Sequence, residues 1–225
     1  MWDGGVNHLE LQPIAPITNP TEMDETLKHV IEKLQRNPVY VQRFKKAFND
    51  TIIDSQKFLK AIAQFTGLMI SNNSRYDKYL RHEDTLSAIE FEGMKLFKSH
   101  CENCHKEPLF TDNSFRNIGL AYDSLFKDSG RAAITGIPDD FMSFKVPSLR
   151  NVELTYPYMH DGRFKTLKEV LNHYSKGDFK TDNFDKSILR NVGLNETEKT
   201  QIIAFLKTLT DKTFTYDRRF ADPNY

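Results

Sequence analysis

Cysteine is scarce in this chain: its 225 residues include only two, Cys101 and Cys104. Small secreted domains that depend on disulfides carry several spaced cysteines, so a disulfide framework is excluded. Two cysteines that lie only three positions apart must serve a local purpose.

An excess of one charge and long apolar runs are also missing. Lysine plus arginine balance aspartate plus glutamate at 31 each, so no net field draws the molecule toward nucleic acid or an anionic membrane. No apolar run approaches the roughly 18 residues that a membrane helix needs. The opening MWDGG has neither the basic nor the apolar region of a signal peptide. We therefore expect no transmembrane segment, and any partner should dock on a local patch.

Helical periodicity dominates what is present, and it predicts an all-α fold. Between residues 24 and 100, apolar side chains recur at three- and four-residue steps, without a two-residue strand pattern. A helix over about residues 86–99 should place Gly93 and Phe97 on one face. The glycine permits a close crossing, which we expect to be made with the helix that carries Phe205.

Residues 106–165 lose this periodicity and gain turn formers, as in TDNS, KDSG and GIPDD. So long a loop usually encloses something. Helix should return at about 166–175 and after Asn195, where Asn195 and Glu198 have the spacing of a capping box. The tail after Asp211 is expected to wrap the surface.

The two cysteines belong to the motif Cys101-Glu102-Asn103-Cys104-His105. Two thiols on one turn can each add to a haem vinyl group, and the following histidine can bind the iron, which is the c-type attachment signature. A thioredoxin-like pair would want a βαβ context, and zinc would want a second Cys or His pair; the sequence shows neither. We therefore predict one covalent haem c.

The motif does not fix the second axial ligand of the iron, on which the function depends. Methionine or histidine there gives an electron carrier, whereas an open site allows peroxide chemistry. The candidates in the loop-rich half are Met142, Met159, His160, His173 and Tyr174. A single methionine is often core filler, and composition alone cannot rank the five.

Two segments in the correct order resemble the bacterial dihaem cytochrome c peroxidases and their relative MauG. One is FKVPSLRNVELTYPYMHDG, residues 144–162, downstream of the haem motif. The other runs from Trp2-Asp3-Gly4 through Gln12 and Pro16 to Glu22-Met23. The resemblance covers Trp2 to about Thr210.

The resemblance implies that Cys101, Cys104 and His105 hold the C-terminal, high-potential haem, and that Tyr174, fourteen positions after His160, is its distal ligand. Peroxidases usually have methionine there and MauG-like members have tyrosine. A phenolate is a hard anionic donor that favours the ferric state and lowers the haem potential. Tyr174 therefore moves the expectation toward MauG-like oxidation, with Met159 or Met142 as the alternative ligand.

Further roles follow from the same resemblance. Trp2 corresponds to the tryptophan between the two haems, Glu22 to the carboxylate beside the peroxidatic haem, and Gln12 to its hydrogen-bonding neighbour. A carboxylate of this kind can move a proton between the two peroxide oxygens. Thr155 and Pro157 fall where family members present carbonyls to a calcium ion, which we expect to bind weakly, if at all.

Family members carry an upstream CxxCH that this chain lacks, so it is interpreted as the C-terminal portion of a dihaem protein. Residues 1–80 would be a partial N-terminal peroxidatic cytochrome domain, and residues 81–225 a cytochrome c domain around the covalent haem. The intact form would reduce hydrogen peroxide with electrons from a small cytochrome c or cupredoxin, in the periplasm and often as a homodimer. The alternatives are MauG-like oxidation of a protein substrate and a monohaem electron-transfer cytochrome.

Overall fold

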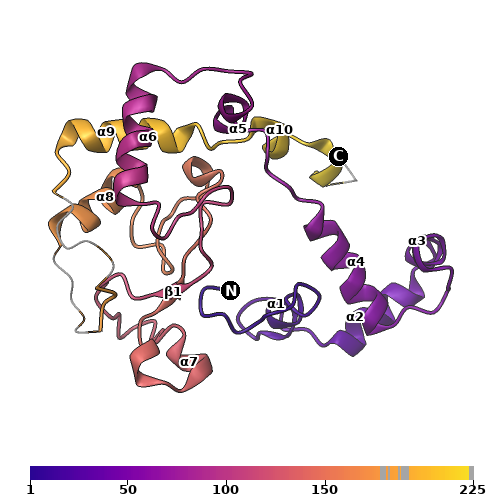
Figure 1. Ribbon diagram of the computed structural model, residues 1–225. Coiled ribbons are helices and arrows are strands. Elements are labelled where there is room, and N and C mark those ends of the chain that lie inside the picture. The colour runs from indigo at the N-terminus through magenta and orange to yellow at the C-terminus, as the bar shows by residue number, and fades with distance from the viewer. Residues whose placement is uncertain (178–180, 182, 187, 189–192, 223–225) are drawn as a thin grey trace. The chain divides into compact units, whose positions relative to one another are not determined.

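Helices make up most of the regular structure, as shown in Figure 1 for this computed structural model, which describes residues 1–177, 181, 183–186, 188 and 193–222. The α-helices are α1 Ile14–Thr18, α2 Leu27–Arg36, α3 Pro38–Phe48, α4 Ser55–Gly67, α5 Arg75–Leu80, α6 Ala88–His100, α7 Ala132–Thr135, α8 Leu167–Lys176, α9 Glu196–Lys207 and α10 Lys212–Thr215. Two-residue strands β1 Phe115–Arg116 and β2 Phe144–Lys145 pair antiparallel. Single 3-10 turns cover Pro138–Asp140, Val152–Leu154 and Arg218–Phe220. The predicted all-α class is confirmed, with this small sheet added.

The chain divides into two units. The smaller unit is Val6–Ile70, and the larger unit is Met1–Gly5 together with Ser71–Tyr225. Within the described residues, no helix has both the length and the apolar character needed to cross a membrane.

The smaller unit holds α1 to α4, and its three longer helices begin at residues whose side chains cap the helix N-terminus. The side chains of Thr26, Asn37 and Asp54 each accept a backbone hydrogen bond at the start of α2, α3 and α4, and Pro38 occupies the first position of α3. Few of its apolar side chains are buried; they are Pro13, Ile17, Phe44, Ile53 and Leu59.

The core of the larger unit lies where α6 crosses α9. Gly93 sits at the crossing: a Cβ there would lie 1.9 Å from the carbonyl oxygen of Gln201. The rings of Phe97 and Phe205 meet with their centroids 5.1 Å apart, and Tyr76 and Phe110 pack edge-on around them. The predicted crossing of these two helices is confirmed.

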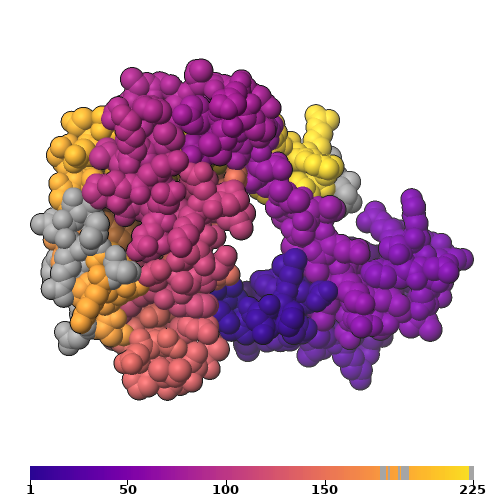
Figure 2. All heavy atoms as spheres, in the orientation of Figure 1, coloured from indigo at the N-terminus to yellow at the C-terminus, as the bar shows by residue number. Residues whose placement is uncertain are grey.

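The helices after the long loop begin at capping boxes. Thr166 and Glu169 cap α8, and Asn195 and Glu198 cap α9, with Asn195 Oδ1 accepting from the Glu198 amide at 3.0 Å. In the loop itself, α7 and its neighbours form a projection on the face shown in Figure 2. These elements place the C-terminus of α6, α8 and the loop around one interior space.

Candidate haem site

A cavity of about 430 Å³ lies inside the larger unit. Apolar side chains form most of its wall, as expected of a site for a large planar ligand. Its apolar lining includes Phe97, Ile118, Phe144, Val146, Leu149, Val152, Leu167, Val170, Leu171, Leu194, Ile202 and Leu206. The lining residues whose side chains could ligate a metal, form a hydrogen bond or carry a charge include Trp2, His100, Cys101, Cys104, His105, Arg116, Lys145, Tyr158, Met159, His160 and Tyr174.

Cys101, Cys104 and His105 open onto this cavity from the turn that ends α6. The amides of Cys104 and His105 donate to the Cys101 carbonyl at 3.2 and 2.9 Å, which winds the motif into one tight turn. Burial raises the pKa of Cys101 to about 12 and also raises the pKa of Cys104. A thioredoxin-like redox pair has a lowered thiol pKa. The raised pKa of Cys101 and Cys104 therefore argues against a redox pair and favours two cysteines that are covalently attached to a haem.

The imidazole of His105 is held in the form that a metal ligand requires. Its Nδ1 lies 3.0 Å from the Phe110 carbonyl oxygen, which can only accept, so Nδ1 carries the proton and Nε2 keeps its lone pair. Burial lowers the pKa of His105. A neutral, oriented imidazole beside two thiols in an apolar cavity fits haem c.

His100 gives an independent sign that the cavity takes a bound group. It lines the cavity as the last residue of α6, and its Nδ1 is buried without a hydrogen-bond partner among the described residues. Buried polar atoms in native proteins nearly always have a partner. A ligand with polar edges, such as haem c, could supply one.

The cavity separates the five candidate distal ligands. Met142 is 2 % exposed and packs in another cluster, and His173 is committed through Nε2 to the Ile118 carbonyl at 2.9 Å; neither lines the cavity. Met159, His160 and Tyr174 all do.

Tyr174 enters the cavity from α8. Burial raises the pKa of its hydroxyl, and Cys101 and Cys104 raise it further, so the phenol shares its surroundings with the two thiols. His160 instead stacks on the ring of Phe144, with centroids 3.6 Å apart.

The remaining predicted site residues fall in both units. Trp2, Thr155 and Pro157 line the cavity of the larger unit, and the Trp2 carbonyl accepts from the Lys145 amide at 2.7 Å. Gln12 and Glu22 belong to the smaller unit and are exposed. The Asn19 amide donates to Glu22 Oε1 at 2.8 Å. No group of three or more His, Cys, Asp or Glu side chains is arranged as metal ligands within the described residues.

Sequence reasoning missed Arg116 and His100. Arg116 lines the cavity from β1, and Asp112, Ser114 and Asp185 hold its guanidinium at 2.9, 2.9 and 2.5 Å. It stands 69 positions from Asp185, so no local spacing could have indicated the contact. His100 directly precedes Cys101 and could have been noticed as a polar residue next to the motif.

Comparison with known proteins shows which proteins this chain resembles. A family model described as di-haem cytochrome c peroxidase matches residues 1–85. The chain is 37 % identical over 213 residues to cytochrome c551 peroxidase of Nitrosomonas europaea, and 35 % identical over 216 residues to methylamine utilization protein MauG of Methylophilus methylotrophus. Each match covers 93 % of this chain, and the chain spans 60 and 63 % of those relatives.

A solved structure extends the likeness to the fold. The crystal structure of a MauG-like protein associated with microbial copper homeostasis superposes with a TM-score of 0.90 at 31 % identity, over all of this chain and 77 % of that one. The chain belongs to the family of di-haem cytochrome c peroxidases and MauG, whose cofactor is haem c.

Proposed function

We propose that this chain binds one haem c through Cys101, Cys104 and His105, and that the intact protein is a cytochrome c peroxidase. The observation that carries the proposal is the CxxCH turn, which opens onto an apolar cavity with its histidine neutral and oriented by the Phe110 carbonyl. When bound, haem c supplies a one-electron redox centre. The overall reaction combines hydrogen peroxide, two protons and two electrons to give two molecules of water.

The side chains of the chain have distinct roles in this proposal. His105 and Tyr174 are the residues that would hold the iron, since both line the cavity. Trp2 lies at the wall where an aromatic ring could shorten an electron path. Glu22 moves the peroxide proton and Gln12 assists it by hydrogen bonding, both from the smaller unit.

The remaining assignments of the proposal concern domains and partners. Residues 1–80 are assigned to the peroxidatic domain, whose haem brings the intact protein to two, and residues 81–225 to the domain of the covalent haem. The electron donor is a small cytochrome c or cupredoxin, the compartment is the periplasm, and the protein is a homodimer. The carbonyls of Thr155 and Pro157 are assigned to a weakly bound calcium ion.

Tyr174 favours a second candidate, MauG-like oxidation of a protein substrate. A phenolate ligand stabilises oxidised iron relative to methionine, which suits long-range removal of electrons more than acceptance of electrons from a cytochrome. The position of Tyr174 on the cavity wall is what supports this alternative.

The test is a visible and electron paramagnetic resonance study of the haem-loaded chain with Tyr174→Met and Tyr174→Phe, each with and without peroxide. Tyr158→Phe is the matched control, because Tyr158 also lines the cavity but its hydroxyl donates to the Val152 carbonyl at 3.0 Å. A tyrosinate-type ferric spectrum that both Tyr174 variants lose and Tyr158→Phe keeps would support tyrosine ligation and the MauG-like candidate. Spectra that are unchanged and silent to peroxide would leave the chain as an electron-transfer module.

If the chain purified with the haem-attachment machinery carries no covalent haem, the proposed function is wrong.

A further inference from the structure

The hydrogen bond on His105 comes from an unusual stretch of backbone. Its acceptor is the carbonyl of Phe110, a residue only 1 % exposed with φ at +54°. Large side chains rarely adopt this left-handed conformation, and it persists only where the surroundings impose it. Contacts from other parts of the chain must therefore hold residues 107–110 in this conformation.

Three successive carbonyls of this segment each meet a donor. The Pro108 carbonyl accepts from Arg150 Nε at 2.9 Å, and the Leu109 carbonyl accepts from Ser148 Oγ at 2.6 Å. The third, of Phe110, meets His105 Nδ1 at 3.0 Å. Two of the three donors, on Arg150 and Ser148, thus come from residues about 40 positions away in the chain.

Tyr76 holds the beginning of the same segment. Its hydroxyl donates to Glu107 Oε1 at 2.6 Å, and its ring packs edge-on against Phe110 with centroids 5.7 Å apart. Tyr76 is 1 % exposed and lies on α5. One side chain therefore fixes the carboxylate of the first residue and the ring of the last.

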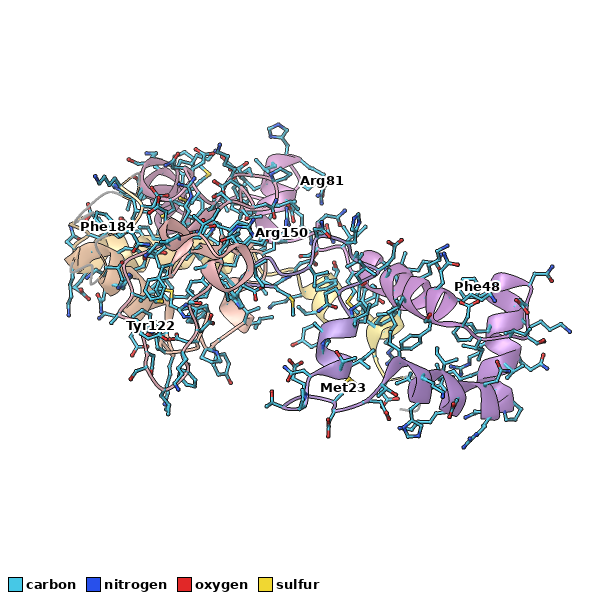
Figure 3. The ribbon with its side chains drawn as sticks, turned by 90° about the horizontal axis from the view of Figure 1, so that it is seen from below. Met23, Phe48, Arg81, Tyr122, Arg150 and Phe184 are labelled. Atoms are coloured by element: carbon cyan, nitrogen blue, oxygen red, sulfur yellow. The ribbon has the colours of Figure 1, made fainter. Side chains whose placement is uncertain are left out.

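Arg150 is itself rigidly held. Its Nη1 and Nη2 donate to Asp77 Oδ2 and Oδ1 at 3.0 and 2.9 Å, and both side chains are about nine-tenths buried. Asp77 also closes the capping box of α5 with Ser74. Figure 3 labels Arg150 beside the stretch of chain that carries Arg81 at the end of α5. A forked, paired guanidinium leaves its Nε directed at one carbonyl only.

The hydrogen bond at Nδ1 of His105 matters because it changes how strongly the imidazole donates electrons to the iron. A carbonyl that accepts from Nδ1 makes the imidazole a stronger electron donor, which favours ferric over ferrous iron. Any group that moves the Phe110 carbonyl changes this donation without touching the iron.

We propose that Arg150 and Tyr76 are positioning residues that hold the Phe110 carbonyl against His105 and thereby lower the midpoint potential of the haem. The inference rests on the proposed function, since without a haem on His105 the hydrogen bond has no iron to influence.

The experiment measures the midpoint potential of the full haem-loaded chain by spectroelectrochemistry, and the iron–histidine stretching band of the ferrous form. Arg150→Lys keeps the charge opposite Asp77 but loses the fork that also reaches Pro108. Tyr76→Phe removes one hydroxyl and keeps the ring. Arg81→Lys, in an exposed ion pair with Glu83 at 2.8 Å, is the matched arginine control.

Tyr79→Phe, whose ring stacks on Tyr76 at 6.0 Å, is the tyrosine control. Changing a partner one step removed from a metal alters affinity or activity about 10- to 100-fold. A tenfold change in the preference for ferric iron is a shift of about 59 mV, so both test variants should move the potential positive by that order and lower the stretching frequency. Both controls should match the unmodified chain.

Unchanged potential and stretching band in Arg150→Lys and Tyr76→Phe, with haem content and circular dichroism intact, would overturn the positioning role and leave the proposed function standing. If Arg150→Lys does not fold, Tyr76→Phe alone decides, because it removes a single oxygen atom. Absence of covalent haem from the unmodified chain would instead overturn both proposals.

Discussion

Replacing Gly93 by alanine should loosen the crossing of α6 and α9 on which the haem cavity is built. The added Cβ would lie 1.9 Å from the carbonyl oxygen of Gln201, 2.5 Å from its carbonyl carbon and 3.1 Å from the Cβ of Phe205. Ordinary contacts are well over 3 Å, and the obstacle is backbone that cannot rotate aside. The two helices must therefore separate.

The size of the effect follows from two opposing contributions. Overpacking of a core costs roughly 1–3 kcal/mol, and the upper end applies here because backbone meets backbone. Alanine regains about 1 kcal/mol of helix propensity over glycine. The net loss in free energy of unfolding is about 2 kcal/mol, which for a protein of this size lowers the melting temperature by roughly 4–8 °C.

Thermal unfolding of the haem-loaded chain, followed by the haem absorbance and by circular dichroism, checks this value. Gly67→Ala is the matched control, because Gly67 ends α4 and a Cβ there would meet nothing within 4 Å. That variant should be neutral or slightly stabilised. A melting temperature for Gly93→Ala equal to or above that of the unmodified chain would refute the close crossing.

Two further outcomes are expected. The double variant Cys101→Ala, Cys104→Ala should lose covalent haem, seen by gel staining, and fail to fold stably, so a cooperative thermal transition in that apo-protein would contradict the placement of haem in the core. Although burial raises it, hydrogen bonds from Ser114 and Arg116 hold the pKa of Asp112 at about 2. Because this is below its unfolded value of about 3.9, the stabilisation is complete above pH 4 and is lost as pH falls toward 2. Asp112→Asn should therefore unfold with a flatter acid dependence, and an unchanged acid limb in a urea titration would argue against this ion pair.

Local patterns in the sequence predicted several helices, the close crossing at Gly93 and the haem motif. The spacing of Gly93 and Phe97 placed both on one helical face, and steric bulk alone made that face the site of a close crossing. Asn195 and Glu198 marked the start of α9, because a capping box depends only on residues three positions apart. The motif from Cys101 to His105 indicated haem c in the same local way, since its three functional side chains share one turn.

Only the tertiary structure decided which side chains meet across the haem cavity. Composition left Met142, Met159, His160, His173 and Tyr174 unranked, and only the family resemblance singled out Tyr174. The direction of a side chain in a long loop depends on contacts made far away in the chain. The fold turned two of them away from the cavity and kept three. It also brought Arg150 to the Pro108 carbonyl, 42 positions distant. Helical periodicity and caps are short-range effects that a sequence displays, whereas burial of a polar group against a particular carbonyl is settled only when the whole core packs.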